Sequence, residues 1–478
     1  MTNPPDDTPR LRRTGTAPAP GILHLGPGAF FRAFLGPFTD EAIGISGGDW
    51  GIIAVSLQST TARDQLAPQG CAYTALERGP EGDIARRIDA IADVMVAPED
   101  PTAIVALLAD PAIRIVSLTV TEKGYCRDPQ TGDLLRDHPD IQHDLANPDR
   151  PRSAIGFIIA GLRARRDGNL PSFTVLTCDN LPMNGRMVRK VVTAFARETD
   201  PDLASWIETN AAFPCTMVDR ITPATTPRDI KSLASVDGYL DHAAIVHEPF
   251  RQWVIEDAFT TGHPDWGAAG AQFVSNVELH ELMKLRCLNG THSALAYLGY
   301  LAGHDTIAEA VADPPFKTLC DRLWQDEILP TLNTPEGEDL SRYCRSLMER
   351  YRNPAMRHRT WQIAMDGSQK LPQRILATIK DRMARGAVPD GLCLVVAGWI
   401  RYVGGRDETG APIDVRDPLA KELKAATRTA DPVGAVLAMP SVFDPEVAAQ
   451  PEFVAAVRAA YDRLCRDGSR ASVAAFTK

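Results

Sequence analysis

The chain has 478 residues, enough for two or three domains, and its 44% hydrophobic and 23% charged content is ordinary for a soluble globular protein. The formal net charge of −10 argues against a nucleic-acid partner or an anionic membrane surface. Nine scattered cysteines without a C-x-x-C pair indicate reduced thiols rather than disulfides or a metal site. Residues 1–20 lack an apolar signal core, and the longest apolar run, 392–400, is too short to span a bilayer. We therefore expect a cytoplasmic protein with no membrane partner and a disordered segment over 1–20.

The first predicted strand, 21–25, runs into the glycine turn Gly26-Pro27-Gly28 and then into a helix. A strand, a glycine turn and a helix in this order form the phosphate-binding turn of dinucleotide-binding proteins. The third glycine of G-x-G-x-x-G is absent, with Phe31 in its place, so the pattern also fits a glycine turn in any βα unit. The candidate cofactor-binding residues are Gly26, Gly28, Ala29, Phe30 and Arg32.

A second strand, 51–57, follows at the spacing of a Rossmann unit. The acidic residue that would hold a ribose 2′-hydroxyl is missing at its end, where Gln58-Ser59-Thr60 stand instead. No arginine cluster favours a 2′-phosphate there. The choice between NAD and NADP is therefore open.

Further strands at 113–121 and 173–178 and the strand-end loop at 217–223 are expected to bring polar residues to the same sheet edge. Asn180 either caps a turn or donates its amide to a substrate oxygen. Asp219 either pairs with the neighbouring Arg220 or takes part in a binding site.

From about residue 275 the pattern becomes helical. We expect helices at 284–300, 305–312, 316–328, 340–350, 373–384 and 391–402. The predicted fold is α/β, with a Rossmann-type dinucleotide-binding domain over 21–274 and a mostly α-helical domain over 275–478.

Three polar residues emerge from the apolar segment 282–298: Lys284, Asn289 and His292. On an α-helix Lys284 and His292 lie about 80° apart around the axis, and Asn289 is about one turn before His292. Desolvation lowers the pKa of a buried lysine, which suits it to act as a base near neutral pH. The alternative is a surface lysine beside an ordinary core histidine.

The chain resembles the polyol-specific long-chain dehydrogenases from about Gly21 into the 460s. The resemblance lies in the glycine turn at 26–33, in Cys178-Asp179-Asn180-Leu181-Pro182, in Val218-Asp219-Arg220-Ile221, and in the K-x-x-x-x-N-x-x-H signature of Lys284, Asn289 and His292. Family members commonly carry histidines where this chain has Phe31 and Phe34. The resemblance implies a zinc-free oxidoreductase with NAD as cofactor, NADP remaining open, and a monomer.

The residues themselves suggest a mechanism of the same kind, and our hypothesis is that Lys284 is the general acid/base. Asn180 and Asn289 would hold the developing alkoxide, His292 would orient the substrate or the lysine, and Asp219 would bind a distal hydroxyl or tune the lysine. Loss of one such oxyanion contact typically costs about 10²–10³ in rate.

The substrate is expected to be a sugar acid, in the pair D-fructuronate and D-mannonate. The stretch 358–374 is similar to that of the uronate reductases, and Arg359, Lys370 or Arg374 could hold a carboxylate. The alternatives are the pair D-mannitol and D-fructose, and a nucleotide-binding sensor without turnover.

Overall fold

The computed structural model describes residues 8–128 and 131–478. The chain divides into two compact units, with the boundary between Glu278 and Leu279. Within the described ranges, no helix is both long and apolar enough to cross a membrane. Residues 1–7 of the segment expected to be disordered lie outside these ranges. Further along that segment, the Leu11 N–H donates to Leu240 O at 2.8 Å and the Arg13 N–H donates to Gln69 O at 2.9 Å.

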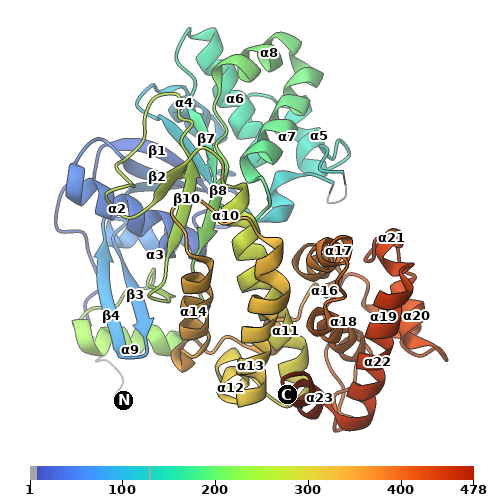
Figure 1. Cartoon of the computed structure of the whole chain (residues 1–478). Helices are drawn as coiled ribbons and strands as arrows, with labels where there is room; N and C mark the ends of the chain where they lie inside the picture. Colours follow the sequence, from blue (N-terminus) through green and yellow to red (C-terminus); the bar gives the residue numbers. More distant parts are fainter. Residues whose placement is uncertain (1–7, 129–130) are drawn as a thin grey trace. The chain divides into compact units, whose positions relative to one another are not determined.

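The N-terminal unit is built on a five-stranded sheet in the order β5-β2-β1-β6-β7, of which Figure 1 labels β1, β2 and β7. Every neighbouring pair in this sheet is parallel. This is the Rossmann-type arrangement that the sequence predicted, and its carboxyl edge carries the loops where ligands bind in such sheets. The strands are β1 (Pro20–Leu25), β2 (Gly51–Ser56), β5 (Ile91–Val96), β6 (Ile115–Leu118) and β7 (Thr174–Thr177).

The sheet is buried on both faces, which explains the continuous apolar runs of its strands. On β1, Leu23 and Leu25 enter one core, and Ile22 enters the other. The first core includes helices α4 (Pro101–Ala109), α6 (Ala154–Asp167), α7 (Asn184–Thr199) and α8 (Pro201–Asn210). The second includes α1 (Ala29–Ala33) and α2 (Leu35–Ser46), with Trp253 and Trp266.

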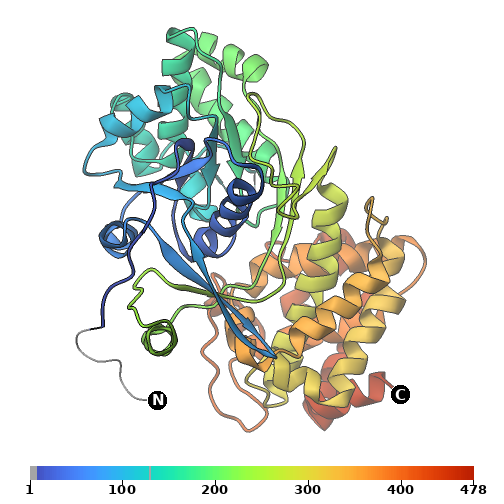
Figure 2. The same ribbon diagram turned by 90° about the vertical axis from the view of Figure 1, so that its left-hand side faces the viewer.

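Two smaller three-stranded sheets complete this unit, in the orders β4-β3-β9 and β11-β10-β8. Their strands are β3 (Tyr73–Gly79), β4 (Gly82–Ile88), β8 (Thr216–Asp219), β9 (Ile245–His247), β10 (Gln252–Glu256) and β11 (Gln272–Val274). The sequence analysis missed the β3–β4 hairpin, a long blue two-stranded ribbon in Figure 2. The sequence feature that predicts this hairpin is the turn Gly79-Pro80-Glu81-Gly82 between two segments that contain β-branched and aromatic residues. The shorter helices are α3 (Thr61–Leu66), α5 (Pro139–Ala146) and α9 (Pro227–Asp237), with 3₁₀ turns η1 (Ala67–Gln69) and η2 (Glu122–Tyr125).

The C-terminal unit is helical, as predicted. Its α-helices are α10 (Glu278–Met283, which begins at the boundary), α11 (Thr291–Ala294), α12 (Ile307–Ala312), α13 (Pro314–Arg322), α14 (Leu340–Tyr351), α15 (Thr360–Ile363), α16 (Gly367–Leu371), α17 (Ala377–Ala384), α18 (Asp390–Val403), α19 (Ala420–Ala426), α20 (Pro432–Leu437), α21 (Pro445–Ala448), α22 (Pro451–Asp467) and α23 (Ser469–Phe476). Helix α18 is buried on nearly all sides, as expected for a helix that is apolar around its whole circumference.

Several helical stretches of this unit are π-helical, in place of the continuous α-helices that the periodicity predicted. They are η3 (Lys284–Gly290), η4 (Leu295–Gly299), η5 (Leu323–Ile328) and η8 (Pro372–Leu376), and short 3₁₀ turns occur at η6 (Leu329–Thr331) and η7 (Pro354–Met356). Since π-helical turns are rare and often lie at functional sites, η3 is notable because it contains Lys284 and Asn289.

Candidate active site

The glycine turn follows β1 at the carboxyl edge of the main sheet. Gly26 has a φ of +90°, and a Cβ there would lie 2.4 Å from the backbone oxygen of Thr119. Only glycine fits that position without strain. At Gly28 the nearest atom to an added Cβ is Gly26 O at 3.9 Å, so the backbone is open on that side. An open glycine backbone at this place suits the close approach of a dinucleotide pyrophosphate.

His24 on β1, a residue that sequence analysis overlooked, forms hydrogen bonds next to this turn. Its Nδ1 lies 2.8 Å from Ser117 Oγ, and its Nε2 lies 2.9 Å from Thr119 Oγ1. Burial lowers the pKa of His24 to about 3, so the ring is neutral. Phe31 stacks on the ring, with centroids 3.9 Å apart. The phenylalanine at the third glycine position thus packs against a histidine from the strand. The sequence feature that could have pointed to His24 is that it is the single histidine within an apolar strand.

The remaining cofactor candidates lie on α1. Ala29 is exposed at its first position, and Phe30 is half-buried and stacks on Phe34 with centroids 5.0 Å apart. Arg32 Nη1 donates to Ala243 O at 2.9 Å and to Gln65 Oε1 at 3.2 Å. These bonds connect α1 to the loop before β9, which is a structural role for the arginine.

Asn180 and Asp219 lie at strand ends, as predicted. Asn180 is exposed after β7, and Asp219 is buried at the end of β8. The Asp179 carboxylate next to Asn180 accepts from the Val120 N–H at 2.9 Å and from the Tyr125 hydroxyl at 2.6 Å. These bonds join the loops after β6 and β7 and hold the backbone that carries Asn180.

Lys284, Asn289 and His292 are all buried in the C-terminal unit. On an α-helix, at about 100° per residue, Lys284 and Asn289 would lie about 140° apart. Because a π-helix bonds residue i to residue i+5, η3 places residues five apart roughly one above the other. The five-residue spacing of the signature therefore matches a π-helical turn, which corrects the α-helical geometry assumed from the sequence.

Three side chains bind the backbone carbonyls of η3. Trp324 Nε1 donates to Cys287 O at 2.9 Å, and the Tyr351 hydroxyl donates to Leu288 O at 3.0 Å. The Thr291 hydroxyl donates to Cys287 O at 2.6 Å and lies 2.8 Å from the Tyr351 hydroxyl. Side-chain donors from η5 and α14 thus stabilise the turn that carries the signature.

The His292 ring lies between two other rings. Its centroid is 4.7 Å from that of Tyr351 and 5.1 Å from that of His358. Burial, followed by the nearby charges of His358, Arg350, Arg374 and Lys284, lowers the pKa of His292 well below its usual value. The ring is therefore neutral, and its buried Nε2 has no hydrogen-bond partner among the described residues. A buried, unpaired ring nitrogen among cations is suited to bind an external polar group.

The three basic candidates differ in their surroundings. Arg359 is exposed just before α15. Lys370 Nζ donates to Met365 O at 2.6 Å, and burial lowers the pKa of its ammonium group to about 8. Arg374 lies on η8, which packs against η3 at Gly290, and burial lowers the pKa of its guanidinium. Of these three cations, only Arg374 is among the charges that act on His292.

Comparison with known proteins identifies the family. The family description "Mannitol dehydrogenase Rossmann domain" matches residues 20–268, and "Mannitol dehydrogenase C-terminal domain" matches residues 276–465. The chain belongs to the mannitol dehydrogenase family.

Individual relatives span nearly the whole chain. D-mannonate oxidoreductase of Escherichia coli (strain K12) is 47% identical over 462 residues, which cover 95% of each protein. Mannitol 2-dehydrogenase of Aspergillus terreus is 40% identical over 95% of this chain and 92% of its own length. Among solved structures, Pseudomonas fluorescens mannitol 2-dehydrogenase, in a ternary complex with NAD and D-mannitol, is 37% identical, with a TM-score of 0.85 over 98% of this chain and 97% of its own.

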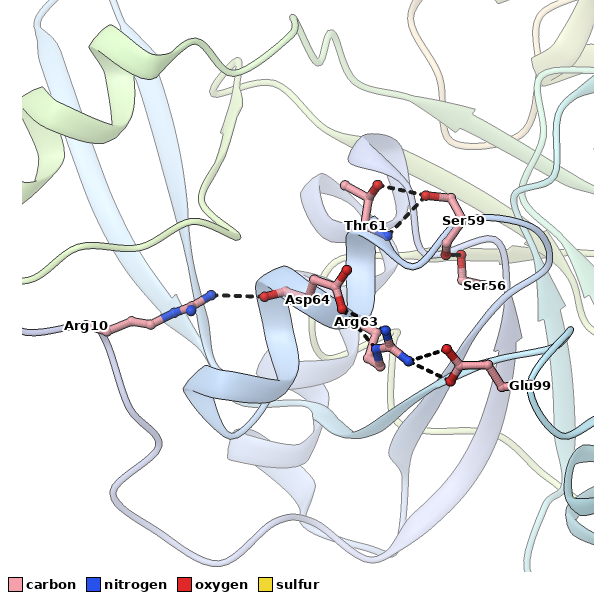
Figure 3. A network of polar contacts seen from close by, with 7 residues as sticks. All are labelled: Arg10, Ser56, Ser59, Thr61, Arg63, Asp64 and Glu99. Atoms are coloured by element: carbon pink, nitrogen blue, oxygen red, sulfur yellow. Dashed lines mark hydrogen bonds and ion pairs between the residues drawn. The ribbon is translucent and has the colours of Figure 1, made fainter.

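This member of the mannitol dehydrogenase family has a polar network at the carboxyl end of β2 (Figure 3). The Ser59 and Thr61 hydroxyl groups are 2.7 Å apart, and Arg63 Nη1 donates to both carboxylate oxygens of Glu99 at 2.5 Å. Sequence analysis missed Arg63 and Glu99, because they are 36 residues apart.

No group of three or more His, Cys, Asp or Glu side chains within residues 8–128 and 131–478 is placed to hold a metal ion.

Proposed function

We propose that the protein is an NAD(H)-dependent oxidoreductase that interconverts D-fructuronate and D-mannonate. The similarity to D-mannonate oxidoreductase over 95% of both chains supports this substrate pair. The glycine turn with its open Gly28 backbone suits the dinucleotide, and this cofactor supplies or takes up the hydride.

Lys284 is the proposed general acid/base. As the free amine it accepts the proton of the substrate hydroxyl, and as the ammonium it returns a proton to the carbonyl oxygen. Asn289, aligned with Lys284 by the π-helical turn, donates its amide N–H to the same oxygen. His292 contacts the substrate through Nε2. Asn180 and Asp219 keep their predicted roles in substrate binding, which alanine variants would test.

The positive charge around His292 is the observation that favours a sugar acid. Arg374 Nη1 donates to the hydroxyl of Ser293, the residue after His292, at 3.5 Å. In addition to burial, the charges of Arg350, Arg374 and Lys284 lower the pKa of the His292 ring. A neutral polyol needs no such charge, whereas a carboxylate is bound best by a cation, and arginine can bind it through two parallel hydrogen bonds. We therefore assign the carboxylate of the substrate to Arg374, with Lys370 and Arg359 as the other candidates.

The test is oxidation of NADH and NADPH by purified protein with D-fructuronate, D-tagaturonate and D-fructose offered separately. Fast turnover of fructuronate would support the proposal. Arg374→Met should then raise KM for fructuronate at least tenfold more than KM for fructose, because only the acid loses an ion pair. Arg428→Met is the matched control, since its side chain is exposed and it is no candidate for the carboxylate.

The second candidate is the interconversion of D-mannitol and D-fructose. The similarity to Pseudomonas fluorescens mannitol 2-dehydrogenase along 98% of this chain favours it. Turnover of fructose with none of either uronate would establish this activity and refute the role of Arg374. Binding of NADH without turnover of any substrate would instead indicate a nucleotide sensor.

A further inference from the structure

The carboxyl end of β2 lacks the carboxylate that commonly binds the adenosine ribose in this fold, because Gln58-Ser59-Thr60 stand there. The sheet order β5-β2-β1 makes the loop after β5 the direct neighbour of this end. The Ala97 N–H donates to Ser56 O at 2.8 Å and fixes that loop against β2. Glu99 comes two residues after Ala97. The loop after β5 therefore brings a carboxylate to the carboxyl end of β2, where the adenosine ribose binds in this fold.

Glu99 is held by Arg63, the third residue of α3. In addition to the two bonds to Glu99, Arg63 Nε and Nη2 donate to Asp64 Oδ1 at 3.0 and 2.8 Å (Figure 3). Four of the five guanidinium N–H groups are thus bound to two carboxylates, and the Arg10 guanidinium donates to the backbone oxygen of Asp64 at 3.1 Å on the other side. The Glu99 carboxylate repels a 2′-phosphate but can accept a hydrogen bond from a 2′-hydroxyl.

The Arg63–Glu99 ion pair is partly exposed to solvent, so it can be broken by a single substitution. The side chains of Arg63 and Glu99 are 31% and 52% exposed. Exposed ion pairs of this kind are weak, so removal of the Glu99 carboxylate would free the Nη1 group of Arg63 at little cost to the fold, while Nε and Nη2 stay bound to Asp64. An arginine with a free Nη1 group and serine and threonine hydroxyls, such as those of Ser59 and Thr61 shortly before it in the chain, are typical phosphate ligands.

We propose that the Glu99–Arg63 pair sets the preference between NAD(H) and NADP(H), with Glu99 in place of the missing carboxylate at the end of β2. This inference rests on the proposed dinucleotide-dependent function. It assigns to these two residues a specificity role that the β2 sequence alone does not contain.

The experiment measures Kd for NADH and NADPH by fluorescence titration without any sugar substrate, so that cofactor binding is separated from turnover. Glu99→Gln should lower the ratio of Kd(NADPH) to Kd(NADH) at least tenfold, because Arg63 becomes available to the 2′-phosphate. Adding Arg63→Ala to this variant should abolish the gain in NADPH affinity. Glu208→Gln is the matched control for loss of a surface carboxylate. Glu208 lies on α8, and its carboxylate forms an ion pair with Arg197 on α7.

Three outcomes would overturn the inference. One is a Glu99→Gln ratio equal to that of Glu208→Gln. Another is a gain in NADPH affinity that persists in the double variant, because Arg63 would then play no part. In the third, the wild-type protein binds neither cofactor. That result would also remove the proposed function, whereas the first two leave it intact.

Discussion

The hydroxyl of Tyr351 is the most informative single group to remove from the candidate active site. It is fully buried, lies 2.8 Å from the Thr291 hydroxyl, and donates to Leu288 O at 3.0 Å. Leu288 directly precedes Asn289 on the π-helical turn. Tyr351→Phe therefore leaves a buried carbonyl without this donor while the ring and its packing against His292 remain.

Leu288 O still accepts from the Thr291 N–H, so the expected loss of stability is that of one buried hydrogen bond, about 0.5–1.5 kcal/mol. For a unit of about 200 residues, each kcal/mol lowers Tm by about 2–4 °C. We expect Tm to fall by about 1–6 °C in differential scanning calorimetry. Because catalysis depends on the position of Asn289, kcat at 25 °C should also fall by about 10–100-fold, with the Kd of NADH unchanged.

Tyr297→Phe is the matched control for stability. It makes the same chemical change in the same unit, but the buried Tyr297 hydroxyl has no hydrogen-bond partner among the described residues. Its removal should leave Tm unchanged or raise it. The reasoning is refuted if Tyr351→Phe has the Tm of Tyr297→Phe and the kcat of the wild type.

Three further predictions concern other parts of the molecule. Lys284→Ala should lower kcat by several decades in a steady-state assay while the Kd of NADH stays within twofold, and surviving turnover would disprove its role as the base. Gly26→Ala should lower both Tm and NADH affinity, because its Cβ would lie 2.4 Å from the backbone oxygen of Thr119, whereas Gly28→Ala should weaken NADH binding without a change in Tm. Burial raises the pKa of Glu327 from 4.5 to about 7. The folded state therefore binds a proton more tightly than the unfolded state, so this stabilisation is present below pH 4.5 and is lost as the pH rises through about 7. Urea unfolding should show a decline of up to about 1.4 kcal/mol per pH unit over this range, and Glu327→Gln should remove that decline.

Local sequence patterns were sufficient for four of the five strands of the main sheet, and only β5 was not predicted as a strand. Strands buried on both faces are continuous apolar runs, and a glycine turn after the first of them predicts a Rossmann unit. For this reason β1, β2 and β7 were predicted to within about two residues. The β3–β4 hairpin was missed because half of it is exposed, and a strand with polar residues has a weaker signal.

The signature of Lys284, Asn289 and His292 was likewise visible as polar residues in an apolar segment. The geometry of the signature could not be predicted from the sequence, because an α-helix and a π-helix share the same local composition. The donors that bind the carbonyls of the π-helical turn, Trp324 and Tyr351, lie 37 and 63 residues away from those carbonyls in the sequence.

The amino-acid sequence by itself thus determined the Rossmann-type fold, the helical second unit and the residue types available for proton transfer. Only the tertiary structure decided which of these groups meet. It placed Glu99 beside Arg63 and His24 beneath the glycine turn, and it placed Arg374 near His292. The physical reason is that periodicity and turn chemistry act over a few residues, whereas these contacts depend on the order of strands and on helices packed from distant parts of the chain.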